Sequence, residues 1–207
     1  MLSADAVVAV PSVKKIGDTI VDSKALNLGE EKYGKVRFSK KINGCSFQQD
    51  AIATHKGYQY AGYYDGNRRV CVARRKLPLG KWEVIRFDDY TFKNNDAHNT
   101  ISIGLCPADG TLHMAFDHHV HPLHYRVSKK GVITNPEKTA WNSALFSPIL
   151  FELEKGKKIK ITYPRFWQTP DGGLQFCYRH RGSGNGDRML VDYDPKTSTW
   201  FNTRQID

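Results

Sequence analysis

The sequence contains no apolar run that approaches the roughly 18 residues of a membrane-spanning helix. Sustained helical periodicity is almost absent, which argues against an all-α fold. The first residues, MLSADAVVAVPSV, lack the basic segment of a secretory signal peptide. The sequence therefore describes either an intracellular chain or one without its natural N-terminus.

Cysteine is scarce and irregularly spaced. The four cysteines, Cys45, Cys71, Cys106 and Cys177, lie far apart and lack the CxxC spacing of common zinc sites. Each lies in or near an apolar, strand-like run. We therefore interpret them as buried apolar side chains and not as disulfide or metal partners.

Acidic residues are outnumbered by basic ones, with 31 Lys and Arg against 21 Asp and Glu and a formal net charge of +10 at pH 7. This balance favours an anionic partner or substrate. The sequence has no helix-turn-helix, zinc-finger or RNP signature, so we expect no nucleic-acid partner. We expect no membrane partner either. An acidic polysaccharide fits a basic, aromatic-rich chain better.

What the sequence does contain is a strand-turn-strand unit in three copies. The copies are GYQYAGYYDG (57–66), GTLHMAFDHH (110–119) and GGLQFCYRHR (172–181). Each copy opens with glycine, reaches an aromatic residue within the following strand, and is followed by a second β-rich run. The copies recur at an interval close to the ~50 residues of a kelch-type propeller blade.

Alternating apolar and polar residues, bounded by Gly, Asn and Asp turns, predict strands and hairpins. The runs DAIATH, YQYAGYY, RVCVARR and WEVIRF give four strands, the number in one propeller blade. We therefore predict an all-β fold, a β-propeller of four-stranded antiparallel blades. The expected blades are roughly 46–92, 97–150 and 158–207, and residues 1–45, with TIVDS and KVRFS, supply strands of an incomplete blade.

Three blades do not close a propeller, which typically has ~4–8. An open array also leaves unpaired strand edges. We therefore expect residues 1–207 to form a single partial propeller domain, about half of a larger ring. A dimer that closes the ring is the alternative.

The repeat predicts a convergence of polar side chains. In an antiparallel blade, the start of the first strand and the end of the second lie on the same face. Four residues occupy such positions or lie close to them, namely His98, His118, Tyr163 and Arg179. These types suit β-elimination on a uronic acid. Arginine neutralises the carboxylate, histidine removes the C5 proton, and tyrosine or histidine protonates the leaving oxygen.

Other chemistries fit less well. Most glycosidases need two carboxylates across the scissile bond, and no pair stands out among Asp50, Asp96 and Asp117. His119 and His121 could share one face of a strand and bind zinc, but suitably spaced further ligands are missing. We therefore predict no metal cofactor, with structural calcium left open. Histidine-based hydrolysis and a non-catalytic sugar-binding module remain alternatives.

Several motifs in the same order resemble one family. The runs QQDAIATHKGYQYAGYYD, NDAHNTISIGL, DGTLHMAFDHHVHPLHYRVS, YPRF and YRHRGSGNGD are similar to the BNR-4 type repeat proteins, over about residues 40–195. These are seven-bladed β-propellers that include ulvan lyases, rhamnosyl-glucuronate hydrolases and fungal lyases acting on rhamnosyl-α-1,4-glucuronate ends. The sequence most resembles the fungal group. The resemblance implies a secreted polysaccharide lyase whose partner is an acidic polysaccharide.

The resemblance also implies residue roles. His118 would be the base and also the acid, His98 and Arg179 would neutralise the glucuronate carboxylate, and Tyr163 would contact the sugar. Arg181 replaces a glycine of the usual family loop, which could alter the cleft rim. We expect further substrate contacts from His119, Arg181, Gln49 and Asp50.

Overall fold

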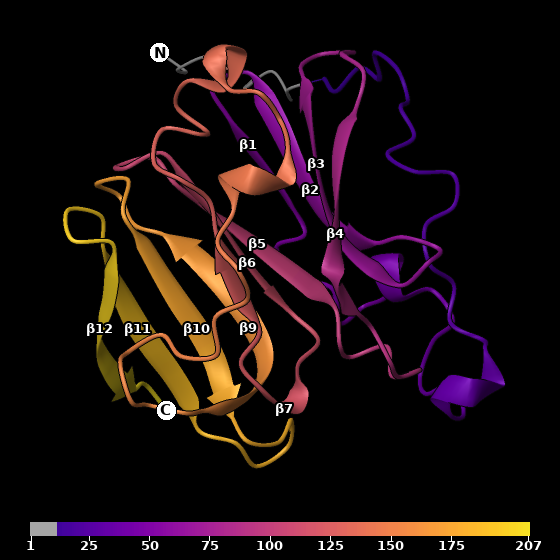
Figure 1. The fold of residues 1–207 in the computed structure, drawn as a ribbon, viewed down its shortest axis with the longest axis vertical. Coiled ribbons are helices and arrows are strands. Elements are labelled where there is room, and N and C mark those ends of the chain that lie inside the picture. The colour runs from indigo at the N-terminus through magenta and orange to yellow at the C-terminus, as the bar shows by residue number, and fades with distance from the viewer. Residues whose placement is uncertain (1–11) are drawn as a thin grey trace, which may run out of the picture.

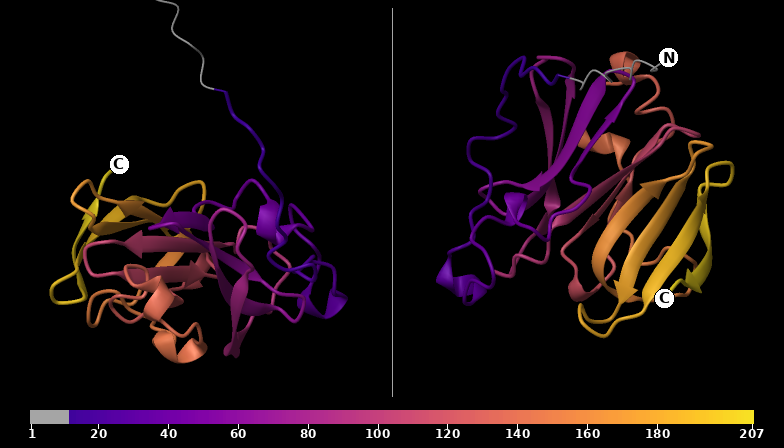
Figure 2. Two further views of the ribbon diagram at one scale, coloured as in Figure 1. Left: turned by 90° about the horizontal axis from the view of Figure 1, so that it is seen from above. Right: turned by 180° about the vertical axis from the view of Figure 1, so that it is seen from behind.

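The computed structural model describes residues 12–207, so most of the apolar N-terminal stretch lies outside the described residues. Three antiparallel β-sheets follow one another in chain order and lie side by side (Figure 1). Two further views show the same succession, from the purple and magenta first sheet to the orange and yellow C-terminal one (Figure 2). The predicted all-β class with antiparallel sheets is confirmed. No helix among the described residues is long and apolar enough to cross a membrane.

The first sheet has the predicted four strands in sequential order. They are β1 (Ile52–His55), β2 (Tyr58–Tyr64), β3 (Arg69–Lys76) and β4 (Glu83–Thr91). β2 and β3 are buried over most of their length, which explains their nearly continuous apolar character.

The second sheet differs from the expected four strands. Its strands are β5 (Ile101–Cys106), β6 (Thr111–Phe116) and β8 (Tyr125–Val127). Two isolated bridges, Tyr125 to Leu150 and Ser128 to Phe146, replace the fourth strand. The short turns η3 (Pro136–Lys138) and η4 (Ser143–Leu145) occupy this connection. Its prolines and serines favour turns over a continuous ladder.

The third sheet has five strands. Its members are β7 (His119–Pro122), β9 (Lys160–Gln168), β10 (Leu174–His180), β11 (Arg188–Asp194) and β12 (Thr199–Gln205). Their spatial order is β12-β11-β10-β9-β7. In the chain, β7 lies between β6 and β8 of the second sheet, but it pairs with β9 of the third. This strand therefore connects two neighbouring sheets.

The backbone supports the threefold repeat. Gly57, Gly110 and Gly172 precede β2, β6 and β10, and all three have positive φ angles, 74°, 75° and 81°. A residue other than glycine would be strained in that conformation. At Gly110 a Cβ atom would also lie 2.7 Å from the Gly131 backbone nitrogen. The same glycine-dependent turn thus opens each copy.

The described part of the N-terminal segment, residues 12–45, contains no strand, although TIVDS and KVRFS were expected to supply strands. It forms the short turns η1 (Glu31–Tyr33) and η2 (Ile42–Gly44) and isolated bridges at Ala25 and Arg37. Most side chains in this segment are exposed, so little apolar burial favours a longer ladder.

Buried side chains fill the spaces between the sheets. One cluster joins the first and second sheets, through residues such as Tyr64, Ile101 and Phe116. A second joins the second and third sheets, through residues such as Ala115 and Phe166. Each such side chain contributes about 1.5–3 kcal/mol by burial. All four cysteines are free and three are buried, which confirms their interpretation as apolar side chains for Cys71, Cys106 and Cys177.

Candidate active site

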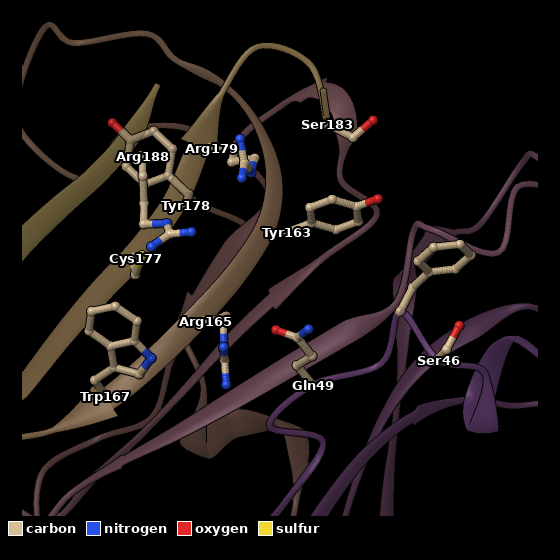
Figure 3. Close-up of a pocket in the computed structure, with 11 residues that line it drawn as sticks. Ser46, Gln49, Tyr163, Arg165, Trp167, Cys177, Tyr178, Arg179, Ser183 and Arg188 are labelled. Carbon is tan, nitrogen blue, oxygen red and sulfur yellow. The ribbon is translucent and has the colours of Figure 1, made fainter. Parts of the chain in front are cut away.

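A cleft of about 430 Å³ lies along β9 and β10 and reaches the segment that precedes β1. Its polar and aromatic lining includes Gln49, Tyr163, Arg165, Trp167, Arg179 and Arg188. Figure 3 shows Trp167, Arg179 and Arg188 on one side and Ser46 on the other, with Tyr163 and Gln49 between them. The structure thus brings together Tyr163, Arg179 and Gln49 of the expected site residues.

Strand alternation explains one wall of the cleft. Tyr163, Arg165 and Trp167 are two residues apart on β9 and are partly exposed, whereas Pro164 and Phe166 between them are buried. Because side chains alternate across a strand, Arg165 and Trp167 share one face, and Tyr163 lines the same cleft. Arg165 and Trp167 were missed by the sequence analysis, although their two-residue spacing from Tyr163 was a usable signal.

Tyr163 has a strained backbone. Its φ angle is 53°, and the β9–β10 register shifts here, since Arg165 pairs with Cys177 while Thr162 pairs with Arg179. This is a β-bulge, which redirects a side chain and commonly occurs beside functional sites. Pro164 suits the bulge because it has no backbone N–H to place in the ladder.

The glycine-rich loop after β10 holds Arg179. The Arg179 guanidinium donates a hydrogen bond to the Gly186 carbonyl at 3.1 Å. A Cβ atom on Gly186 would lie 2.3 Å from the His180 carbonyl oxygen, so only glycine fits. Arg179 forms no ion pair with a carboxylate among residues 12–207, which leaves its charge available for a ligand.

The other two cleft arginines are paired. Arg165 lies 3.3 Å from a carboxylate oxygen of Asp50, and Arg188 lies 3.4 Å from Asp207. Asp50 thus contacts the cleft through Arg165 rather than lining it. Three arginines and no lining carboxylate make the cleft cationic. Such a cleft attracts an anionic ligand.

His98 lies at the edge of the cleft. Its ring centroid is 3.9 Å from that of Phe47, 4.1 Å from that of His119 and 5.8 Å from that of Tyr163. Phe47 and Tyr163 both line the cleft. His98 is 6% exposed, so its ring is fixed by its neighbours. The predicted proximity of His98 and Tyr163 is therefore present in the structure.

His118 is not brought to the cleft. It is fully buried, and its Nε2 accepts a hydrogen bond from the His124 backbone N–H at 2.9 Å. Burial lowers the pKa of His118 well below its usual value. The adjacent His119 instead points to Asp96, with 2.9 Å between its Nδ1 and a carboxylate oxygen.

His119 and His121, which were considered and rejected as a zinc pair, are also separated. His119 contacts Asp96, whereas His121 lies 3.3 Å from Asp117. Among the described residues, Asp96, His98 and His119 form a group whose ligand-type atoms lie within 4.8 Å of one another. Both imidazoles already bond to Asp96, and Arg37 lies 3.5 Å from the same carboxylate. A guanidinium in this position disfavours a bound cation.

The backbone of Arg181 is held by hydrogen bonds at the start of the glycine-rich loop. Its backbone φ is 72°, its N–H donates to the Lys160 carbonyl, and its carbonyl accepts from the Thr162 hydroxyl. Its side chain does not line the cleft, contrary to the expected substrate contact. The backbone of Arg181 thus anchors the loop that holds Arg179.

Comparisons with known proteins agree with this architecture. The BNR repeat-containing family matches residues 58–206. The chain belongs to this family. A long-isoform ulvan lyase from Pseudoalteromonas sp. (strain PLSV) is 28% identical to this BNR repeat chain, over 73% of the chain and 19% of the relative. A short-isoform ulvan lyase from Alteromonas sp. (strain LOR) is 24% identical over 73% of the chain and 36% of the relative.

Solved structures show the same fold. The crystal structure of polysaccharide lyase Uly1 superposes on this BNR repeat chain with a TM-score of 0.70 at 20% identity, over 89% of the chain and 49% of Uly1. A PL25 ulvan lyase bound to -[GlcA(1-4)Rha3S]- gives a TM-score of 0.59 at 13% identity, over 90% of the chain and 41% of that lyase. The chain thus spans about half the length of Uly1 and about a fifth of the long isoforms.

Proposed function

We propose that this chain is part of a polysaccharide lyase that cleaves a bond next to a glucuronate by β-elimination. The observation that carries the proposal is the cationic cleft in which Arg179, without a carboxylate partner, lies with Tyr163. The relatives named ulvan lyases support the reaction class. The lyase bound to -[GlcA(1-4)Rha3S]- supports a glucuronate next to a rhamnose.

Arg179 binds the uronate carboxylate. A guanidinium forms two parallel hydrogen bonds to a carboxylate, which withdraws charge and makes the neighbouring C5 proton more acidic. The C5–H bond and the C4–O bond then break, and a C4=C5 double bond forms. Gln49 and Trp167 supply hydrogen bonding and an apolar ring surface for the sugars.

We assign proton removal to Nε2 of His98, because its ring lies beside Tyr163 and Phe47 of the cleft wall. The Tyr163 hydroxyl protonates the leaving oxygen, and the proton that the imidazole gained restores the phenol, so protons balance over the cycle. His98 replaces His118 in this assignment, because the His118 ring is buried with its Nε2 occupied. No metal takes part in these steps.

Membership of this family also supports a larger propeller. We propose that the three sheets are consecutive blades of a seven-bladed propeller, in which β7 and the isolated bridges are local departures from the four-stranded blade. The blades would correspond to residues 46–92, 97–150 and 158–207. A polysaccharide too large to enter a cell suits a secreted enzyme, and a chain of this kind would act outside the cell. A rhamnosyl-glucuronate linkage is the finer proposal for its substrate.

The test is a product analysis with two substrates, gum arabic and ulvan. The purified 207-residue chain is incubated with each, and both near-ultraviolet absorbance and free rhamnose are followed. A rise in absorbance in either substrate indicates an unsaturated uronate and supports the lyase. Rhamnose without absorbance indicates hydrolysis and contradicts it. If neither product forms from either substrate, the result contradicts catalysis by this chain and favours a sugar-binding module.

A further inference from the structure

A single carboxylate joins the two histidines beside the cleft. Asp96 Oδ1 lies 2.6 Å from His98 Nδ1, and Oδ2 lies 2.9 Å from His119 Nδ1. The His98 backbone N–H also donates to Oδ1, at 3.0 Å. The side chain of Asp96 is 10% exposed, so the arrangement is shielded from water. One residue of the DAHN motif thus touches both imidazoles.

This geometry determines which nitrogen carries each proton. Burial raises the pKa of Asp96, but hydrogen bonds from the His98 backbone, His119 and the His98 ring lower it below its usual value. An ionised carboxylate only accepts hydrogen bonds, so both Nδ1 atoms must donate. In a neutral imidazole the other nitrogen, Nε2, is then the acceptor.

Neither Nε2 atom has a hydrogen-bond partner among residues 12–207. The other histidines next to this region differ. The Nε2 of His118 is occupied by a backbone N–H, and the Nδ1 of His121 faces both the amide donor of Asn99 and the acceptor oxygens of Asp117. Two neighbouring rings whose Nδ1 atoms share one carboxylate therefore distinguish the pair held by Asp96.

We propose that Asp96 is a positioning residue that holds both His98 and His119 in the Nδ1–H form, so that their Nε2 atoms are ready to accept a proton from the substrate. The proposal rests on the lyase function proposed above. Asp96 does not touch the reacting atoms and acts through the two rings. Arg37, 3.5 Å from the same carboxylate, keeps it ionised when one ring becomes charged during turnover.

The test is Asp96→Asn in the full chain. The amide has nearly the same size but presents an N–H₂ group to one ring, which favours the opposite tautomer of that ring. Nitrogen-15 NMR of the histidine side chains reads the tautomers without any substrate. The wild type is expected to show Nδ1–H for His98 and His119, and the variant to show Nε2–H for at least one of them. Unchanged tautomers in the variant would overturn the proposal.

Kinetics give the second readout. The variant is expected to lose about 10²–10⁴-fold in kcat with little change in KM, the size of effect seen when general acid–base catalysis is impaired; the same carboxylate-to-amide change in a serine protease triad costs about 10⁴-fold. Asp22→Asn is the matched control. Asp22 is also 10% exposed and hydrogen-bonded, but it pairs with Arg86 and Tyr63 outside the cleft.

The outcomes separate the two proposals. A wild-type chain with the expected tautomers but no lyase product supports positioning by Asp96 and contradicts the lyase function. A lyase whose kcat is unchanged by Asp96→Asn overturns the positioning role, as does equal loss in Asp22→Asn. Stoichiometric bound zinc that EDTA removes together with activity would overturn it too, because a metal would then replace the Nδ1 protons.

Discussion

Tyr163 and Arg179 line one cleft from neighbouring strands although they are not partners in the ladder. The bulge in β9 gives Arg179 the partner Thr162 and leaves Tyr163 outside the register. Tyr163 therefore extends toward the cleft with a positive φ angle, next to an arginine that the glycine loop holds in place. A hydroxyl and a planar cation are thereby presented to the same ligand.

Tyr163→Phe tests the role of the hydroxyl. The Tyr163 hydroxyl has no hydrogen-bond partner among residues 12–207, so stability should change by less than about 0.5 kcal/mol. The kcat for the unsaturated product should fall by about 10²–10⁴-fold, because proton donation to the leaving oxygen is lost. Tyr193→Phe is the control, since its hydroxyl bonds to Asp109 away from the cleft. Full activity of Tyr163→Phe would exclude the assigned role.

Arg179→Lys tests neutralisation of the carboxylate. Lysine keeps the charge but cannot form two parallel hydrogen bonds, so kcat/KM should fall by about 10- to 100-fold. Substrate titrations and initial rates measure the change. Arg204→Lys serves as the control because Arg204 pairs with Asp192 outside the cleft. If both lysine variants behaved alike, Arg179 would have no special function.

Variants of His118 distinguish a structural role of this residue from a catalytic one. His118→Ala would leave the buried His124 N–H without an acceptor and should cost about 1–3 kcal/mol in unfolding free energy. His118→Gln carries an oxygen near the position of Nε2 and should retain most stability and activity. His98→Gln, at the residue assigned as the base, should lose turnover. If His118→Gln folded but were inactive, His118 would have to be assigned as the base after all.

His113 should make stability depend on pH. Burial lowers its pKa from 6.5 to about 3, so between these values the unfolded chain binds a proton that the folded chain does not. Falling pH therefore destabilises the fold, by up to about 1.4 kcal/mol per pH unit from this residue. Urea unfolding at roughly pH 4.5, 5.5 and 6.5 measures the slope.

The control for this slope is His113→Gln. Glutamine does not titrate, so the variant should be less stable at pH 7, because His113 bonds to Thr111 and Tyr125, but should show a shallower slope. An identical slope in the two proteins would show that His113 does not cause the pH dependence.

Much of the fold follows from local patterns. Alternation and the three turn glycines predicted the strands, and the repeat placed Tyr163, within a first strand, near Arg179, at the end of a second strand, as the cleft lining has them. The pairing of β7 with β9 could not be predicted, because the choice of partner strand depends on distant residues. Residues 12–45 include residue types typical of strands, but too few of their side chains are buried to stabilise a ladder.

The choice between His118 and His119 also lay beyond the sequence. Asp117 has a φ angle of 60°, and Val120 one of 62°, so the alternation of faces is interrupted on both sides of the two histidines. Once alternation is interrupted, spacing along the strand no longer tells which ring is buried. Only the packing of His118 against His124, and of His119 against His98, decides it.

The pairing of β7 with β9 of the third sheet makes the site a cooperative unit. The Thr162 hydroxyl accepts from the Val120 N–H and donates to the Arg181 carbonyl, so β7, β9 and the glycine loop share one side chain. A local opening that frees any of these segments disturbs the imidazoles, the phenol and the guanidinium together. Amide hydrogen exchange at Val120 would therefore report how often the whole constellation is intact, and weak protection there would set an upper limit on the fraction of competent molecules.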